Sequence, residues 1–187
     1  TIHGYSKLID PAALPEAYRP YIEGIRAEAV SLGAVVTNFL NFARPTQLAV
    51  GAVDLRALCE RTADEIRADP GMGEGDLDLM GEFPTVPGDE VLLRQAFRNL
   101  LRNAIEACAG GPMVPRIVVE SSVDRSRGIC TVSVSDNGPG IAPEARDRIF
   151  QPFFTTKRSG TGLGLAIVQK IIVSHNGRVT AGASTDG

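Results

Sequence analysis

The 187 residues of the chain carry a formal net charge of −3, with 43% hydrophobic and 22% charged residues. This balance is typical of a globular protein with a packed core, and it excludes an intrinsically disordered chain. The sequence lacks the clustered lysine and arginine that a nucleic-acid-binding surface needs to neutralise phosphates, so we expect no nucleic acid among the partners. The length suits one ordinary domain with a smaller attached element.

Cysteine usage and hydropathy narrow the class of protein further. Cys59, Cys108 and Cys130 are widely spaced and form no C-x-x-C pair, which indicates reduced, packed thiols rather than disulfides or a zinc site. No apolar run approaches the ~20 residues of a membrane-spanning helix, and no signal-peptide pattern opens the chain. We therefore expect a cytoplasmic segment, with any membrane attachment confined to segments upstream of Thr1.

A long amphipathic segment between Pro15 and Pro45 predicts a helix that ends near Arg44, because a proline disfavours helical geometry in the residue before it. Its apolar residues recur at spacings of three and four, the heptad pattern of coiled coils and helical bundles. These residues are Ile22, Ile25, Ala29, Leu32, Val36, Phe39 and Ala43. Residues Ile2 to Ile9 form the end of an earlier helix, so residues 1–45 predict an antiparallel helical hairpin.

Such a hairpin leaves its apolar seam half exposed. Two copies that pair in a four-helix bundle would bury it, and we therefore expect a homodimer. The alternative is that the long helix packs against the second domain of its own chain.

Residues 46–187 alternate between strand-like and helical patterns. We expect strands at Leu48–Val53, around Leu77 and Leu79, at Arg116–Val123 and at Ile129–Ser135, and helices after Asp54, at Asp89–Ala109, at Pro143–Phe150 and at Leu163–His175. The pattern predicts an α+β fold, in which helices cover one side of a sheet to form an α/β sandwich.

Three motifs in this second domain could bind a nucleotide. Asn99 and Asn103 lie one helical turn apart, and an amide oxygen is a hard ligand suited to Mg²⁺. D-N-G-P-G begins at Asp136, at the end of a strand, where a carboxylate can accept a hydrogen bond from an exocyclic amine such as that of adenine. G-T-G-L-G-L, from Gly160, leads into a helix whose first N–H groups suit phosphates.

Each motif alone has a plainer interpretation. Asparagine amides often bond nearby backbone, and Asn-Gly often marks an ordinary turn. The second glycine loop is neither a Rossmann fingerprint nor a Walker loop, because the preceding strand and the G-K-[ST] ending are both missing from the sequence.

The combination is more specific than its parts. N-L-L-R-N-A-I-E-A, D-N-G-P-G, F-Q-P-F-F-T-T-K and G-T-G-L-G-L, in this order, resemble the N, first glycine, F and second glycine boxes of the sensor histidine kinase ATP-binding domain. The match covers about Leu92 to Gly182, and the helical hairpin fits the dimerisation and phosphotransfer domain of that family. With only Arg158 and Ser159 between F-F-T-T-K and the glycine loop, the lid resembles that of the nitrogen-regulation sensors.

The resemblance implies a Bergerat-type fold, Mg·ATP as the ligand, and a response regulator as a partner. Asn103 would coordinate Mg²⁺, while Asn99 and Lys157 would serve catalysis near the phosphates. Asp136 would bind the adenine amine. The implied nucleotide-binding residues are Asn103, Asp136, Asn137, Gly138, Gly140, Phe153, Thr156, Gly160, Thr161, Gly162, Leu163 and Gly164.

Hydrolytic relatives such as gyrase and the heat-shock chaperone carry glutamate at the position of Asn99, where it activates water. Asparagine cannot act as a general base, so we expect phosphoryl transfer to a protein histidine rather than hydrolysis. The alternatives are a hydrolytic ATPase that gates a dimer and a catalytically silent dimerisation module.

The phosphoacceptor box of the family, H-E-[LF]-R-[NT]-P-L, is missing from the sequence, so we expect the acceptor upstream of Thr1; the alternative is a degenerate homologue. The family also has a final strand of the form G-x-x-F-x-V-x-L-P, which we expect beyond Gly187. Neither histidine fits the acceptor role. His3 aligns after the acceptor, and His175 ends a helix, where it suits the helix dipole.

Overall fold

The computed structural model describes residues 2–43, 48–108, 114–157 and 160–182. The expected helix end at Arg44, the boundary at 45 and 46, the Arg158–Ser159 lid and the last five residues lie outside this part of the chain. The chain divides into two compact units, Thr1–Arg44 and Pro45–Gly187. We describe each unit by itself.

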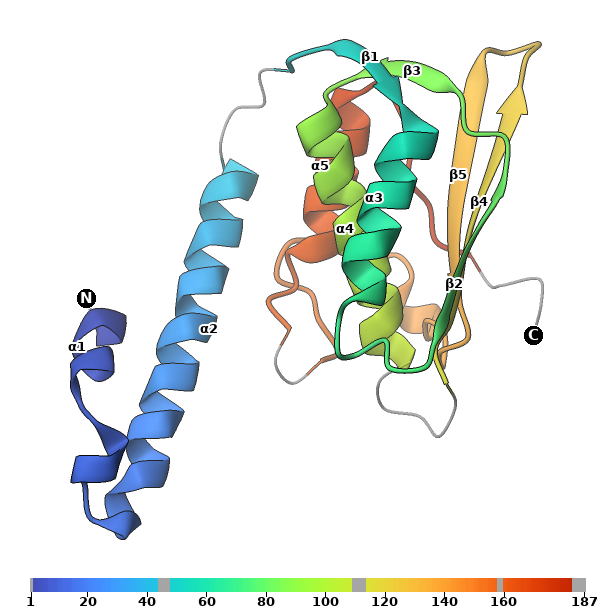
Figure 1. The fold of residues 1–187 in the computed structure, drawn as a ribbon. Coiled ribbons are helices and arrows are strands. Elements are labelled where there is room, and N and C mark those ends of the chain that lie inside the picture. Colours follow the sequence, from blue (N-terminus) through green and yellow to red (C-terminus); the bar gives the residue numbers. More distant parts are fainter. Residues whose placement is uncertain (1, 44–47, 109–113, 158–159, 183–187) are drawn as a thin grey trace. The chain divides into compact units, whose positions relative to one another are not determined.

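The first unit is a helical hairpin (Figure 1). Helix α1 spans Ile2–Leu8, the 3-10 turns η1 and η2 span Pro11–Ala13 and Glu16–Tyr18, and α2 spans Arg19–Ala43. Asp10 caps η1, since its carboxylate accepts a hydrogen bond of 2.9 Å from the Ala12 N–H. The predicted long helix is present but begins later than the sequence indicated, because residues after Pro15 first form η2.

Arg26 ties the two arms of the hairpin together. Its guanidinium donates to the carbonyl oxygens of Ser6, at 2.9 and 3.0 Å, and of Ile9, at 2.6 Å. Ser6 lies in the last turn of α1 and Ile9 directly follows the helix, where carbonyl groups lack helical partners. The apolar seam of α2 is nevertheless largely uncovered within this unit, because Ile22 is buried whereas Leu32 is 59% exposed and Val36 49% exposed.

The second unit contains two small sheets. Strands β1 (Gly51–Asp54) and β3 (Thr85–Gly88) pair antiparallel, whereas β2 (Asp76–Gly81), β4 (Arg116–Asp124) and β5 (Ile129–Asp136) form a mixed sheet in the order β2-β4-β5. β2 runs parallel to β4, with Leu77 opposite Ile117, and β5 runs antiparallel to β4, with Val134 opposite Val119. Leu77, Ile117 and Val119 are buried on one face of this sheet.

Three helices cover that face: α3 (Leu55–Arg67), α4 (Glu90–Cys108) and α5 (Gly164–Ser174). Figure 1 shows them side by side, with α4 in contact with both neighbours and with the sheet. The core between the layers is built from fully buried side chains, including Leu58, Leu101, Leu163 and Val168. The α+β sandwich that the sequence predicts is therefore confirmed.

The structure differs from the sequence-based elements in two places. Strand β3 was not predicted, because Pro87 and the brevity of Thr85–Gly88 hide it; Pro87 is tolerated since β3 pairs on one side with β1 only. The helix expected at Pro143–Phe150 is wrong, since only Pro143–Ala145 form a 3-10 turn, followed by further turns. Pro143 favours a first turn, but too few apolar residues follow to bury a longer helix face.

Asp89 and His175 join the start of α4 to the end of α5. Asp89 is 8% exposed, and its carboxylate accepts from the N–H groups of Ala49 at 2.9 Å and Leu92 at 3.1 Å, which caps α4. The Nε2 of His175 accepts from the Asp89 N–H at 2.9 Å, so its Nδ1 donates to the Ile171 carbonyl at 2.7 Å. Both ring nitrogens of His175 therefore serve the fold.

This cap makes stability depend on pH. Burial alone would raise the pKa of Asp89, but hydrogen bonds from the backbone of Ala49, Leu92 and Val91 outweigh burial and hold the pKa below its ordinary value. A carboxyl whose pKa is lower in the folded chain stabilises the fold above its unfolded pKa, and this contribution is lost as pH falls through the folded pKa.

We expect Asp89→Ala to lower the free energy of unfolding at pH 7 by about 1–2 kcal/mol, because two partly buried N–H groups lose their acceptor and α4 loses its cap. The difference from the wild type should shrink below about pH 4, where the wild-type carboxyl also becomes protonated. Urea unfolding at several pH values measures both. The exposed Asp147 provides the control, since Asp147→Ala should change stability little. A difference independent of pH would contradict this account of the cap.

The structure bears on two expectations from the sequence, that the cysteines are reduced and packed and that no helix spans a membrane. All three thiols are free, and burial raises the pKa of Cys59 to about 12, as expected for an inert packed thiol. Among the residues that the structure describes, no helix is long and apolar enough to cross a bilayer.

Candidate nucleotide site

Helix α4 forms the spine of the candidate site. Asn99 donates through Nδ2 to the carbonyl of Gly164 at 3.4 Å, and a Cβ placed on Gly164 would lie 3.8 Å from Nδ2 of Asn103. Both predicted amides therefore converge on the first residue of α5, although they are 65 and 61 residues away from it in the sequence. Both side chains are half-buried, a position in which an amide can still reach a ligand.

The start of α5 offers N–H groups at the same place. Leu163 precedes the helix and makes no side-chain capping hydrogen bond, so the first N–H groups of α5 remain available to an anion. The Leu163 side chain is completely buried and fixes the helix start in the core. Its predicted contact with a nucleotide could therefore come only from its backbone.

The first glycine loop lies against the other end of α4. Asp136 accepts from the Gly138 N–H at 2.9 Å, and a Cβ on Gly138 would lie 3.0 Å from the Cβ of Ala107 and 2.8 Å from Oδ1 of Asp136. Glycine therefore suits the position where this loop approaches the helix, since any Cβ there would crowd Ala107 and Asp136. The carboxylate of Asp136, half-buried at the end of β5, keeps a second oxygen that can accept from a base amine.

Asn137 is placed differently from the other predicted ligands. Its Oδ1 accepts from the Arg116 N–H at 2.9 Å and from the Cys108 thiol at 3.2 Å, and its Nδ2 donates to the Val114 carbonyl at 3.0 Å. These contacts join the loop to β4 and α4. They indicate that Asn137 shapes the loop, and direct contact with a nucleotide remains a prediction for this residue.

The F and second glycine boxes are locked together through their backbones. The Phe153 N–H donates to the Gly162 carbonyl at 2.9 Å, and both residues have positive φ, +67° and +65°. A Cβ on Gly162 would collide with the backbone of Phe153, so this position requires glycine. Gly140 also has positive φ, +74°, but open space around it. Phe154 packs beneath Arg148, whose guanidinium lies 4.5 Å from the ring centre.

Lys157 lies in a turn organised by Thr155. The Thr155 hydroxyl accepts from the Lys157 N–H at 3.1 Å, and a Cβ on Gly160 would lie 2.6 Å from that hydroxyl. The Lys157 ammonium is 2.6 Å from Oε2 of Glu106 on α4. Thr156 is exposed, and the Thr161 hydroxyl accepts from the Leu163 N–H at 3.4 Å.

One helix thus brings both loops and the lysine together. From Asn99 to Ala107, α4 rises about 12 Å, with the amides and the start of α5 at one end and Asp136 at the other. Sequence reasoning missed Glu106, Ala107 and Thr155. Glu106 was detectable in principle, because it follows Asn99 by seven residues and Asn103 by three, on the same helix face.

The site offers few side chains that could bind a metal ion. In the part of the chain that the structure describes, no three His, Cys, Asp or Glu side chains gather as a metal site. The amide oxygen of Asn103 fits Mg²⁺, which is often held by one or two protein ligands together with substrate phosphates.

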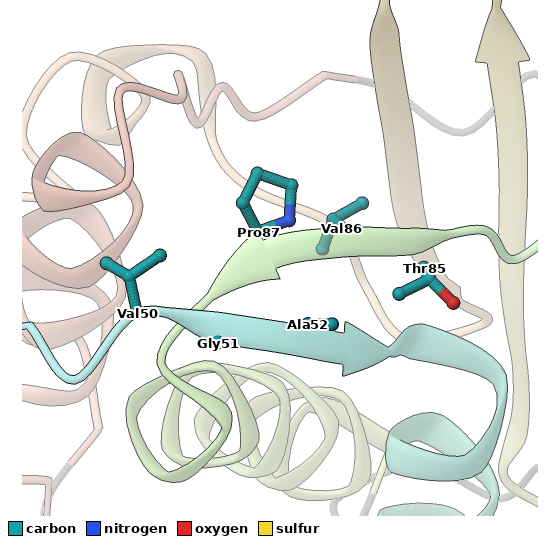
Figure 2. Close-up of a pocket in the computed structure, with 6 residues that line it drawn as sticks. All are labelled: Val50, Gly51, Ala52, Thr85, Val86 and Pro87. Carbon is teal, nitrogen blue, oxygen red and sulfur yellow. The ribbon is translucent and has the colours of Figure 1, made fainter.

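A hollow elsewhere on this unit is unrelated to these groups. It measures about 390 Å³ and lies on the β1–β3 ribbon, between Val50, Gly51, Ala52, Thr85, Val86 and Pro87 (Figure 2). Its lining has no charged side chain and includes none of the predicted nucleotide-binding residues. We assign no ligand to it.

The fold and this site define an ATP-binding α/β sandwich. Residues 88–187 match the family described as histidine kinase-, DNA gyrase B-, and HSP90-like ATPase, and the chain belongs to this family. The resemblance that the four boxes indicate is therefore confirmed.

Its relatives include named sensor kinases. The signal transduction histidine-protein kinase AtoS of Escherichia coli K12 is 33% identical over 95% of this chain and 29% of its own length. The sensor histidine kinase ZraS of the same strain is 37% identical over 86% of this chain and 34% of its own length. The chain thus spans about a third of the curated relatives it matches.

Solved histidine kinases share the fold. Full-length ShkA in complex with AMPPNP superimposes with a TM-score of 0.78 and 30% identity, over 98% of this chain and 39% of ShkA. Histidine kinase ThkA in complex with the response regulator protein TrrA gives 0.74 and 27% identity, over 100% of this chain and 54% of that chain.

Proposed function

We propose that the chain is the ATP-binding domain of a sensor histidine kinase with part of its dimerisation and phosphotransfer domain. It binds Mg·ATP and transfers the γ-phosphoryl group to a histidine on the helical bundle, from which an aspartate of a response regulator receives it. The observation that carries this proposal is the convergence of Asn99 and Asn103 on the start of α5. AtoS and ZraS, which are named histidine kinases, support it.

The role of each residue would depend on its position along α4. Asp136 would accept a hydrogen bond from the adenine amine, while Gly138 lets the loop approach the base. At the other end, the first N–H groups of α5 would neutralise phosphate charge, and Asn103 would hold Mg²⁺. The Lys157 ammonium, which lies beside Glu106 between the two ends, would reach the terminal phosphates from there. Mg²⁺, when bound, supplies charge neutralisation. Catalysis would rest on positioning and charge, as in other phosphoryl transfers.

Asn99 argues for transfer rather than hydrolysis. Its amide donates to the Gly164 carbonyl and has no basic atom with which to deprotonate water. This favours the kinase over a hydrolytic ATPase that gates a dimer.

We expect Asn99→Glu to raise steady-state ATP hydrolysis by about 10-fold or more, because a well-positioned general base typically contributes about 10²–10⁴-fold and an introduced one less. Phosphate release with Mg·ATP measures it. Asn99→Gln, which keeps an amide, is the matched control and should stay near the wild-type rate. No gain from glutamate, in a variant that still binds ATP, would argue against Asn99 as the residue that suppresses hydrolysis.

The uncovered seam of α2 supports a homodimer, because Leu32 and Val36 are about half exposed within the described hairpin. A second copy of the same hairpin would bury both seams in a four-helix bundle. ThkA was solved in complex with the response regulator protein TrrA, and we propose that a response regulator is a partner of this chain.

Light scattering should report the mass of two chains for the wild type and of one for Leu32→Glu, because a buried, unpaired carboxylate at the seam opposes association. Glu23→Ala, on the exposed face of α2, is the control and should remain dimeric. A wild type that is monomeric at all concentrations would contradict the homodimer.

A further inference from the structure

The lysine proposed for the terminal phosphates already has an anionic partner in this structure. Glu106, on α4, places Oε2 2.6 Å from the Lys157 ammonium, and its other oxygen lies 3.6 Å from a guanidinium nitrogen of Arg102. The Lys157 and Glu106 side chains are 37% and 43% exposed, so water and ligands reach the pair. The two residues come from different elements, 51 positions apart.

The pair lies between the two amides and the Asp136 end of α4, because Glu106 directly precedes Ala107. Glu106 follows Asn103 by three residues, which places it about 4.5 Å further along α4 and on the same face. A carboxylate and a phosphate oxygen offer the ammonium the same kind of charge-assisted hydrogen bond. Lys157 can therefore exchange one for the other if its side chain moves by about one helical turn towards Asn103.

We propose that Glu106 is a positioning residue that competes with the γ-phosphate for Lys157. This inference rests on the proposed function of the site. Without a triphosphate, the Glu106 carboxylate holds the ammonium against α4. A γ-phosphate, which carries more negative charge than a carboxylate, takes the ammonium over, so that release of Lys157 from α4 requires a triphosphate.

The proposal predicts that removing the Glu106–Lys157 charge pair increases the affinity for ATP. Glu106→Gln leaves Lys157 without its competitor, so ATP should bind about two- to fivefold more tightly, the range expected for a pair this exposed. ADP offers no γ-phosphate and should bind as it does to the wild type. The effect should also fade as salt rises, because salt screens exposed charge pairs.

The test is calorimetric titration of the whole chain with Mg·ATP and Mg·ADP in four forms: wild type, Glu106→Gln, Lys157→Met and the double variant. In the Lys157→Met background, Glu106→Gln should change nothing, because the competition needs the ammonium. Glu82→Gln removes another short carboxylate–cation pair, with Arg125 at 2.7 Å, and serves as the matched control, with ATP affinity unchanged.

Weaker or unchanged ATP binding by Glu106→Gln overturns the inference, as does a gain that persists without Lys157, which would indicate simple repulsion between Glu106 and phosphate. An equal gain for ADP overturns it as well. If the folded wild type binds neither nucleotide, the proposed function fails together with the inference; if the wild type binds Mg·ATP, only the inference is at stake.

Discussion

Asp136→Ala should weaken ATP binding about 10- to 100-fold, the range expected when a hydrogen bond to a charged acceptor is lost. Asp136 ends β5, half-buried, and accepts from the Gly138 N–H with one oxygen, so the second remains for the adenine amine. The variant loses both contacts. The first of these contacts is the bond that holds Gly138 in place where the loop approaches Ala107.

Inosine triphosphate separates recognition of the base from damage to the loop, because it lacks the exocyclic amine. The wild type should prefer ATP over inosine triphosphate, and Asp136→Ala should bind the two alike. Asp124→Ala is the control, since this aspartate, at the end of β4, bonds only to its own turn through Ser126 and Arg127 among the contacts described. If Asp136→Ala keeps the preference for ATP, Asp136 does not accept a hydrogen bond from the adenine amine.

Asn103→Ala should weaken ATP binding about 10- to 100-fold in the presence of Mg²⁺, the range seen when groups that support a metal site are removed. In excess chelator, the wild type and the variant should bind ATP equally weakly. This dependence on Mg²⁺ follows from the proposed role. If the amide only packed against Gly164, its removal would reduce ATP affinity equally with and without the metal.

Titrations with and without Mg²⁺ therefore measure the role of Asn103 directly. Gln169→Ala provides the matched control, since it removes an exposed amide from α5 and should leave both titrations unchanged. An Asn103→Ala defect of equal size in chelator would contradict a metal ligand and indicate a structural role.

The sequence predicted the elements whose patterns are long and regular. α4 and α5 carry strong helical periodicity, and the alternation in Arg116–Asp124 and Ile129–Asp136 reveals β4 and β5. Strand β3 has four residues and a proline, so no local pattern distinguishes it from a loop. Only its pairing with β1, more than thirty residues earlier, makes it a strand.

In the candidate site too, local motifs could be predicted from the sequence, whereas contacts between residues far apart in the chain could not. Glycine boxes can be recognised locally, because glycine favours positive φ and avoids the collision of a Cβ at Gly162 with the Phe153 backbone. The contact of Glu106 with Lys157 depends on how the F box folds back onto α4, which no local pattern encodes. The three bonds of the Asn137 amide to Val114, Arg116 and Cys108 were hidden for the same reason.

The central claim is that α4, the two glycine loops and Lys157 form one Mg·ATP site. Calorimetric titration of the wild-type chain with ATP, in Mg²⁺ and then in excess chelator, tests it most directly. We expect one ATP bound per chain in Mg²⁺ and binding at least about tenfold weaker in chelator. A chain whose circular dichroism shows it to be folded, but which binds no ATP in Mg²⁺, would contradict the claim.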